Sequence, residues 1–140
     1  EYDSGDIIKV VQPIVDGKAE VVYGSRRLEK SNTQYSSLAF YLGGMGLTWA
    51  TNILYFSNIT DEATCLKAAK LDLIRSLKIE ADGFSWEPEI SAKILRKGIT
   101  IFEVPIRYYP RKVKSGKKIK MTDGFIALWT LLKWRFKKLG

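Results

Sequence analysis

The 140-residue sequence contains no histidine and a single cysteine, Cys65. Without histidine, imidazole catalysis and the common zinc sites are excluded. A single thiol forms no internal disulfide, so a reducing compartment is the default expectation. Any catalysis would therefore depend on carboxylates, Lys, Arg, Tyr or a hard metal ion bound by carboxylates.

Several sequence signatures are also missing. The chain has no internal repeat, Walker motif, GxGxxG loop, zinc-ligand spacing or nucleophile elbow. It starts at Glu1 rather than Met, with no signal peptide or transit segment. At this length one core is well supported and two are not. We therefore expect a single domain, residues 1–140, that is a piece of a longer protein.

Charged residues are absent from a long central segment. No Lys, Arg, Asp or Glu occurs from residue 31 to residue 60, and Asp61 and Glu62 then arrive together. A carboxylate at the edge of an apolar segment is a candidate catalytic group. A turn or helix cap explains Asp61 equally well, because Asp is common at both.

Positive charge is concentrated at the C-terminal end. The net charge is +8, and residues 111–140 hold ten Lys or Arg against Asp123 alone. The partner of this segment is expected to be anionic: a phosphate, a lipid head-group surface or nucleic acid. No nucleic-acid-binding motif is present, so we predict no nucleic-acid partner.

Hydrophobic periodicity predicts an α/β chain. One predicted strand leads directly to Arg26 and Arg27, and ligands of open α/β sheets often bind at such strand ends. We expect helices over 6–15, 38–56, 71–77, 86–97 and 121–138, and strands over 19–23 and 99–109, the second at a sheet edge because of Pro105.

The apolar segment 38–56 is a poor candidate for a membrane span. Three glycines interrupt it, and each weakens a helix by about 1 kcal/mol. We expect it to pack on the sheet with one face toward a membrane or lipid groove. Residues 112–140 are predicted to form a basic loop that grips phosphate, followed by a basic amphipathic helix lying on anionic lipid.

Seven motifs in order resemble the second half of the catalytic domain of polyprenyl-phosphate glycosyltransferases, the dolichyl-phosphate mannose synthase type of glycosyltransferase family 2. They cover nearly the whole chain: Glu1-Tyr2-Asp3, Val21-Val22-Tyr23-Gly24-Ser25-Arg26, Leu47-Thr48 with Thr51-Asn52-Ile53-Leu54-Tyr55, Thr60-Asp61 with Thr64-Cys65-Leu66-Lys67, Glu87-Pro88-Glu89-Ile90, Glu103-Val104-Pro105-Ile106-Arg107-Tyr108-Tyr109, and Gly116-Lys117-Lys118-Ile119.

The resemblance implies a partial GT-A fold, a mixed sheet flanked by helices of the nucleotide-diphospho-sugar transferase type. It implies an inverting enzyme that moves mannose or glucose from a nucleoside-diphosphate sugar to a dolichyl or undecaprenyl phosphate, with Mg²⁺ or Mn²⁺. The chain would start just after the family's Asp-x-Asp metal motif. Glu1 would then be a metal-side ligand, and the piece alone would be inactive.

The resemblance also implies roles for individual residues. Catalytic candidates are Asp61, Glu87 and Glu89, although the helix dipole alone accounts for acidic residues at a helix start. Candidates for binding the lipid phosphate are Ser25, Arg26, Arg111, Lys117 and Lys118. A second family arginine is missing from residues 40–46, and Arg27 or Lys112 could substitute for it.

The alternative hypothesis is a non-catalytic module that binds an anionic membrane through its basic C-terminal helix. In either case we expect a location at the cytoplasmic face of a membrane. A half-sheet exposes a strand edge, so we also predict a dimer through that edge.

Overall fold

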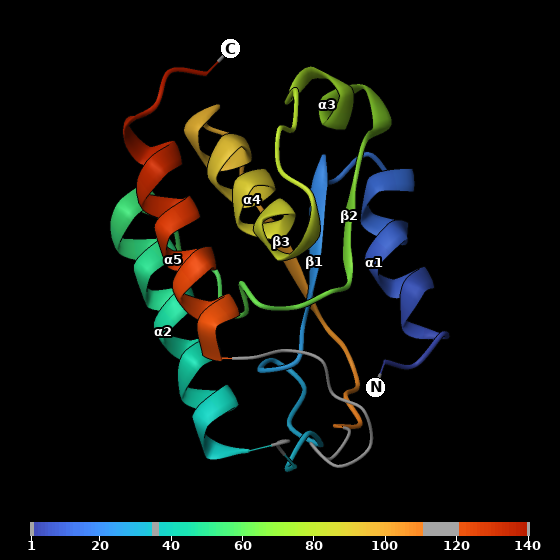
Figure 1. Cartoon of the computed structure of the whole chain (residues 1–140). Helices are drawn as coiled ribbons and strands as arrows, with labels where there is room; N and C mark the ends of the chain where they lie inside the picture. Colours follow the sequence, from blue (N-terminus) through green and yellow to red (C-terminus); the bar gives the residue numbers. More distant parts are fainter. Residues whose placement is uncertain (1, 35–36, 111–120, 140) are drawn as a thin grey trace.

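A small mixed sheet lies at the centre of the molecule. The computed structural model describes residues 2–34, 37–110 and 121–139. Within these ranges the sheet has three strands, with β1 (Val21–Ser25) between β2 (Lys67–Ala69) and β3 (Phe102–Pro105). β2 runs antiparallel to β1, and β3 runs parallel to it. Figure 1 shows this sheet flanked by helices, so the predicted α/β class with a mixed sheet is confirmed.

Helices cover both faces of the sheet. α1 (Asp6–Val15) packs on one face, where Val10 meets Val22 and Ile106. α4 (Trp86–Arg96) packs on the other, where Ile90 and Ile94 join the cluster of Val21 and Tyr23. Successive strand residues point to opposite faces, and every residue of β1 is buried because both faces are covered.

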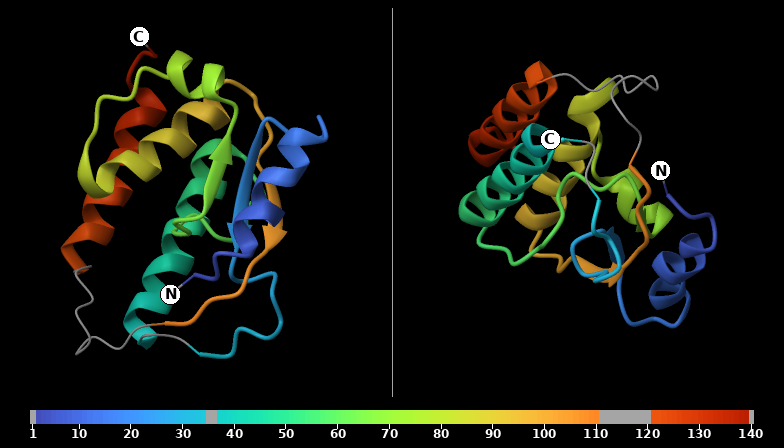
Figure 2. Two further views of the ribbon diagram at one scale, coloured as in Figure 1. Left: turned by 90° about the vertical axis from the view of Figure 1, so that its right-hand side faces the viewer. Right: turned by 90° about the horizontal axis from the view of Figure 1, so that it is seen from below.

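Two long helices form an outer layer beside α4. α2 (Leu38–Tyr55) and α5 (Met121–Phe136) pack against each other, and α5 also packs on α4. Ala92, Leu131 and Trp134 are the buried centre of this layer. In the views of Figures 1 and 2 these helices lie on the side of the sheet away from α1. α2 and α5 therefore form a further helical layer on this side of the sheet.

Most element predictions are confirmed. The five predicted helices occur within two residues of their expected ends, including the short α3 (Leu71–Ser76). Strands were expected at 19–23 and 99–109 and occur at 21–25 and 102–105. Neither β2 nor the 3-10 helix η1 (Gly83–Ser85) was predicted. Three residues are too few to show strand periodicity, so pairing with β1 alone defines β2.

The prediction of an amphipathic C-terminal helix needs correction. α5 buries Ala127, Leu131 and Trp134, whereas Phe125 and Trp129 are 70% and 65% exposed. The helix is therefore apolar on two faces, one packed and one exposed, with Asp123 in its first turn and its basic residues Lys133 and Arg135 in its last. None of the helices in the described ranges combines the length and the hydropathy needed to cross a bilayer.

Gly24, the fourth of the five residues of β1, allows the close approach of α1 and of the segment after β3. A Cβ at this position would lie 2.7 Å from Cγ2 of Ile106 and 3.2 Å from Cγ2 of Val10. We expect Gly24→Ala to lower the free energy of unfolding by about 1–3 kcal/mol through overpacking, measured by urea denaturation.

The matched control is Gly43→Ala on α2, where the added methyl would meet no atom within 4 Å. There alanine should raise the free energy of unfolding by about 0.5–1 kcal/mol, because glycine is unfavourable inside a helix. Equal effects of the two substitutions would contradict the packing described for Gly24.

Candidate functional site

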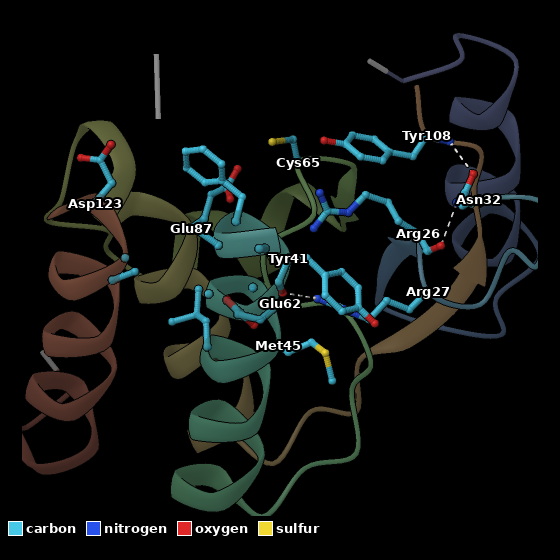
Figure 3. A pocket seen from close by; sticks show the side chains of 18 of the residues that line it. Arg26, Arg27, Asn32, Tyr41, Met45, Glu62, Cys65, Glu87, Tyr108 and Asp123 are labelled. Carbon is cyan, nitrogen blue, oxygen red and sulfur yellow. Dashed lines mark hydrogen bonds between the residues drawn. The ribbon is translucent and has the colours of Figure 1, made fainter. Parts of the chain in front are cut away.

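A cavity of about 490 Å³ opens at the carboxyl end of β1, between that strand and the outer helices. Figure 3 shows its lining. The polar and charged residues around it are Arg26, Arg27, Glu29, Lys30, Asn32, Gln34, Tyr41, Glu62, Cys65, Glu87, Tyr108 and Asp123. The remaining lining consists of apolar residues and glycines, namely Ala39, Phe40, Gly43, Gly44, Met45, Leu47, Ala63, Phe84, Pro88, Met121, Gly124 and Ala127.

Arg26 follows β1 directly and is held by Asp61. Its Nε lies 2.7 Å from Oδ2 of Asp61, its Nη2 lies 2.8 Å from Oδ1, and its backbone N–H also donates to Oδ2. Burial opposes the charge, but the hydrogen bonds to Asp61 raise the pKa of Arg26 above its usual range. Asp61 is fully buried and is not among the cavity-lining residues. In this structure it positions Arg26.

Glu103 of β3 in turn holds the turn that carries Asp61. Its carboxylate accepts hydrogen bonds from the backbone N–H groups of Thr60 and Asp61 and from the Thr60 hydroxyl. Burial raises the pKa of Glu103 despite these bonds. Ser25, predicted to bind phosphate, is fully buried outside the lining, and its hydroxyl lies 2.6 Å from that of Thr60. Two strands and one turn are thus tied together beneath Arg26.

Arg27 reaches the cavity from the other side of the same strand end. Its guanidinium lies 4.8 Å from the ring centre of Tyr41, a residue of α2. Its Nε is buried and has no hydrogen-bond partner among the described residues. A Cβ on Gly44 would lie only 3.2 Å from its Nη2. The Arg27 guanidinium therefore lies beside residues 40–46 of α2. The family resemblance predicts an arginine within that part of the helix.

Asn32 and Tyr108 complete this end of the cavity. The Asn32 amide donates to the carbonyl oxygens of Arg26 and Ile106 and accepts from the backbone N–H of Tyr108. The Tyr108 ring lies 4.9 Å from the Arg26 guanidinium carbon. These contacts join the segment after β1 to the segment after β3. The two arginines are thereby fixed on rigid backbone.

Glu62 lies deeper in the cavity wall and is 1% exposed. Its backbone N–H donates to the Thr48 hydroxyl of α2. Burial raises the pKa of the Glu62 carboxyl to about 7, while Lys67 and the nearby Ser91 hydroxyl act in the opposite direction. The Lys67 ammonium lies 3.8 Å from Oε1 of Glu62 and 3.6 Å from Oε2 of Glu87. A lysine therefore sits between two cavity carboxylates.

The two predicted glutamates of α4 lie in different surroundings. Glu87 lines the cavity, and its side chain is 32% exposed. Glu89 is fully buried outside the lining. It accepts from the backbone N–H groups of Glu80 and Ala81 and pairs with Lys93 at 2.7 Å. The structure thus brings Glu87 to the cavity and uses Glu89 to hold the segment that leads into η1.

Four predicted site residues, Glu1, Arg111, Lys117 and Lys118, lie outside the described residues, as does Lys112. In the part of the chain that the structure describes, no group of three or more carboxylate or cysteine side chains is placed to hold a metal ion. The prediction of Mg²⁺ or Mn²⁺ with Glu1 as a ligand therefore stays a prediction.

Some lining residues were not assigned a role by sequence reasoning. Glu62 stands beside Asp61 in the sequence, and their joint arrival after the uncharged segment was the available signal. Tyr41 and Asn32 gave no signal, because each enters the site through contacts between distant segments. Tyr108 belongs to one of the seven motifs, but the sequence assigned it no contact with Arg26.

Two curated proteins are similar to this chain in sequence, both at low identity. One, from Methanococcus voltae, is named a UDP-N-acetylglucosamine--dolichyl-phosphate N-acetylglucosaminyltransferase and is 27% identical over 99% of this chain and 56% of its own length. The other, an uncharacterised protein of Methanocaldococcus jannaschii, is 22% identical over 94% of this chain and 55% of its own. The chain thus spans about half the length of these relatives. No family model matches. No solved structure matches either.

The raised pKa of Glu62 predicts a pH-dependent stability. Between about pH 4.5 and pH 7 the unfolded chain loses this proton while the folded chain keeps it, so the free energy of unfolding falls as pH rises through that window. Glu62→Gln should remove on the order of 3 kcal/mol of this decline, because one pKa unit corresponds to about 1.4 kcal/mol. Urea denaturation of both proteins from pH 4.5 to pH 8 measures it.

The control is Glu80→Gln, which changes an exposed glutamate whose carboxylate pairs with Lys137 and whose pKa is lowered by that contact. It should leave the decline between pH 4.5 and pH 7 in place. If the free energy of unfolding of the Glu62→Gln protein fell with pH as much as that of the wild-type protein, Glu62 would have the same pKa in the folded and the unfolded chain. That result would contradict the prediction.

Proposed function

We propose that this chain is the acceptor-binding half of an inverting glycosyltransferase of family 2 with a GT-A fold, which transfers a sugar from a nucleoside-diphosphate sugar to a polyprenyl phosphate. The observation that carries the proposal is the pair Arg26 and Arg27 at one side of a cavity that also has an extensive apolar lining. A lipid phosphate has these two kinds of surface, an anionic head and a hydrocarbon chain. The named function of the Methanococcus relative supports the same acceptor class.

The two arginines suit a phosphate dianion. Arg26 directs Nε and Nη2 to Asp61, and no described residue hydrogen-bonds its Nη1, which is left for a ligand. Arg27 adds a second guanidinium, which extends toward the cavity from the same strand end. Two fixed cations both bind and orient a phosphate group, and arginine does so through paired hydrogen bonds. Arg27 takes the place of the family arginine missing from residues 40–46.

The apolar part of the cavity suits an isoprenoid chain. Ala39, Phe40 and Leu47 of α2 line it together with Met121 and Ala127 of α5. α2 carries no charged residue along its whole length, so no ionic group must be desolvated when hydrocarbon enters. The lipid would then extend from the arginines along the two outer helices.

Asp61 has a positioning role in this proposal. A phosphate acceptor is already largely ionised near neutral pH, since its second pKa is roughly 6, so a strong general base is not required. By holding Arg26, Asp61 keeps a positive charge where the acceptor oxygen must attack. Glu87 remains a candidate for contacting the sugar, whereas the contacts of Glu89 assign it to the scaffold.

The donor side is proposed to lie outside this chain, which would leave the piece alone inactive. The family resemblance favours mannose or glucose as the sugar, and the name of the Methanococcus relative favours N-acetylglucosamine. The divalent metal, if bound by Glu1 and further carboxylates, would neutralise the donor diphosphate. Because the described residues contain no such cluster, no step of the proposal is assigned to it.

The site assignment is tested by substitution in the full-length protein. Arg26→Ala and Asp61→Asn should each lower the rate of sugar transfer to polyprenyl phosphate by about a hundredfold. The first removes the preorganised positive charge at the acceptor phosphate, and the second loosens the contact that holds that charge in place. Transfer of radiolabelled sugar to a short-chain polyprenyl phosphate measures the rate. Arg75→Ala, on an exposed turn of α3, is the control and should retain full activity. Unchanged rates in both site variants would refute the assignment.

A second candidate function is binding to an anionic membrane surface at the cytoplasmic face, with or without catalysis. The exposed apolar side chains of α2 and α5 favour it, notably Trp49, Ile53, Phe125 and Trp129. Lys133 and Arg135 in the last turn of α5 would face lipid head groups, each contributing about 1 kcal/mol near the surface. The predicted dimer remains a prediction, and the short β2 and the proline in the edge strand β3 both limit pairing at the sheet edges.

Flotation with vesicles tests this second function. The chain should float with vesicles containing one-third phosphatidylserine and should be released as salt is raised from about 0.1 M to 1 M, where charge interactions are screened. Trp129→Ser should weaken flotation, whereas Ile8→Ser, on the exposed face of α1 across the sheet, should not. Absence of salt-sensitive flotation would exclude this function.

A further inference from the structure

The buried carboxyl group of Glu62 has an ammonium and a hydroxyl nearby, those of Lys67 and Ser91, which lower its pKa, but burial outweighs both. Both oxygens of Glu62 are buried, and neither has a hydrogen-bond partner among the described residues. The Lys67 ammonium lies 3.8 Å from the nearer oxygen, beyond hydrogen-bonding distance. Lys67 instead donates to the Glu62 backbone carbonyl oxygen at 2.8 Å and lies 4.9 Å from the Tyr23 ring centre.

The backbone around Glu62 is firmly held. Its N–H donates to the Thr48 hydroxyl, which itself donates to the Gly44 carbonyl oxygen of α2. Asp61, the preceding residue, is bound to Arg26. A carboxyl group fixed in this way and left without donors is unfavourable in the free protein, because buried polar atoms normally have partners. A ligand that supplies hydrogen-bond donors would relieve that cost.

The chemistry of the cavity narrows the class of ligand. The arginines are at one side of it, while Glu62 and Glu87 lie nearer α2 and α4 in Figure 3. A second anion is disfavoured beside two carboxylates, and Lys67 already occupies the place of a cation between them. Neutral donors remain, namely hydroxyl or amide N–H groups. A sugar attached to the phosphate carries several of them.

We propose that Glu62 binds a hydroxyl or amide N–H group of the sugar that is transferred, forming a sugar subsite next to the phosphate-binding arginines. This inference rests on the proposed glycosyltransferase function and assigns a specificity-determining residue to it. The subsite would hold the glycosyl phosphate product, in which sugar and phosphate are joined, by its two ends: arginines at the phosphate and Glu62 at the ring.

Binding of two small phosphates to the full-length protein tests the proposal. Glucose 1-phosphate and cyclohexyl phosphate have rings of similar size, and only the first carries hydroxyl groups. At pH 8 and in the absence of donor and lipid, titration calorimetry should give about tenfold tighter binding of glucose 1-phosphate, the gain from a hydrogen bond to a charged group. A bare apolar wall would give the opposite order, because cyclohexyl phosphate is the more hydrophobic ligand.

Variants then assign the preference to Glu62. Glu62→Met removes the acceptor at nearly constant length and should abolish or invert the preference, whereas Glu62→Gln, which keeps one acceptor oxygen, should retain part of it. Glu29→Gln is the control, because this cavity carboxylate already accepts hydrogen bonds from Ser31, and it should keep the full preference.

The outcomes separate the two proposals. Equal binding of both ligands by the wild-type protein, tighter binding of cyclohexyl phosphate, or an unchanged preference in a folded Glu62→Met protein would overturn the role of Glu62 while leaving the phosphate site intact. Failure of both ligands and of inorganic phosphate to bind would overturn the proposed function and this inference together. If Glu62→Met does not fold, the wild-type comparison and Glu62→Gln decide.

Discussion

The site depends on the ion pair between Arg26 and Asp61. A guanidinium that follows a buried strand must be neutralised locally or excluded from the interior, and Asp61 neutralises it through two side-chain hydrogen bonds and one from the backbone. Removing either partner would leave a buried charge without compensation. The same pair aims one edge of the arginine toward the cavity, so stability and ligand binding depend on one contact.

Glu103 extends this constraint into the sheet. By accepting from Thr60 and Asp61, it ties the turn before β2 to the parallel strand β3. Asn32 makes a comparable connection between the segments that follow β1 and β3. The cavity mouth is consequently built on hydrogen bonds between segments far apart in sequence, which keep the charged groups in place before any ligand arrives.

The outer helices supply a different kind of surface. α2 is uncharged, and α5 carries Asp123 in its first turn and its basic residues in its last, so the wall they form is mainly apolar both inside the cavity and on the exposed side. Beside this wall, in the turn between α2 and β2, both carboxyl oxygens of Glu62 are buried without a hydrogen bond among the described residues. An apolar wall with one buried acceptor and a cationic mouth matches a ligand that joins hydrocarbon, phosphate and polyol.

Hydrophobic spacing, glycines and capping residues in the sequence were sufficient to predict the helices, and the apolar spacing is clearest in α1 and α4, which bury Val10 and Ile90 with Ile94. The sequence also placed Arg26 and Arg27 at a strand end and drew attention to Asp61. It did not predict β2, nor which face of α5 is buried, since short strands and helices apolar on two sides carry no periodic signal.

The local pattern of the sequence thus determined the elements, the charge distribution and the candidate residues. Tertiary structure alone decided their roles: it buried Asp61 against Arg26, directed Glu89 into backbone contacts, brought Glu87 to the cavity and left Glu62 there without a donor. The physical reason is that a carboxylate's function depends on its partners and its solvent exposure, and both are set by segments that meet only in the folded chain.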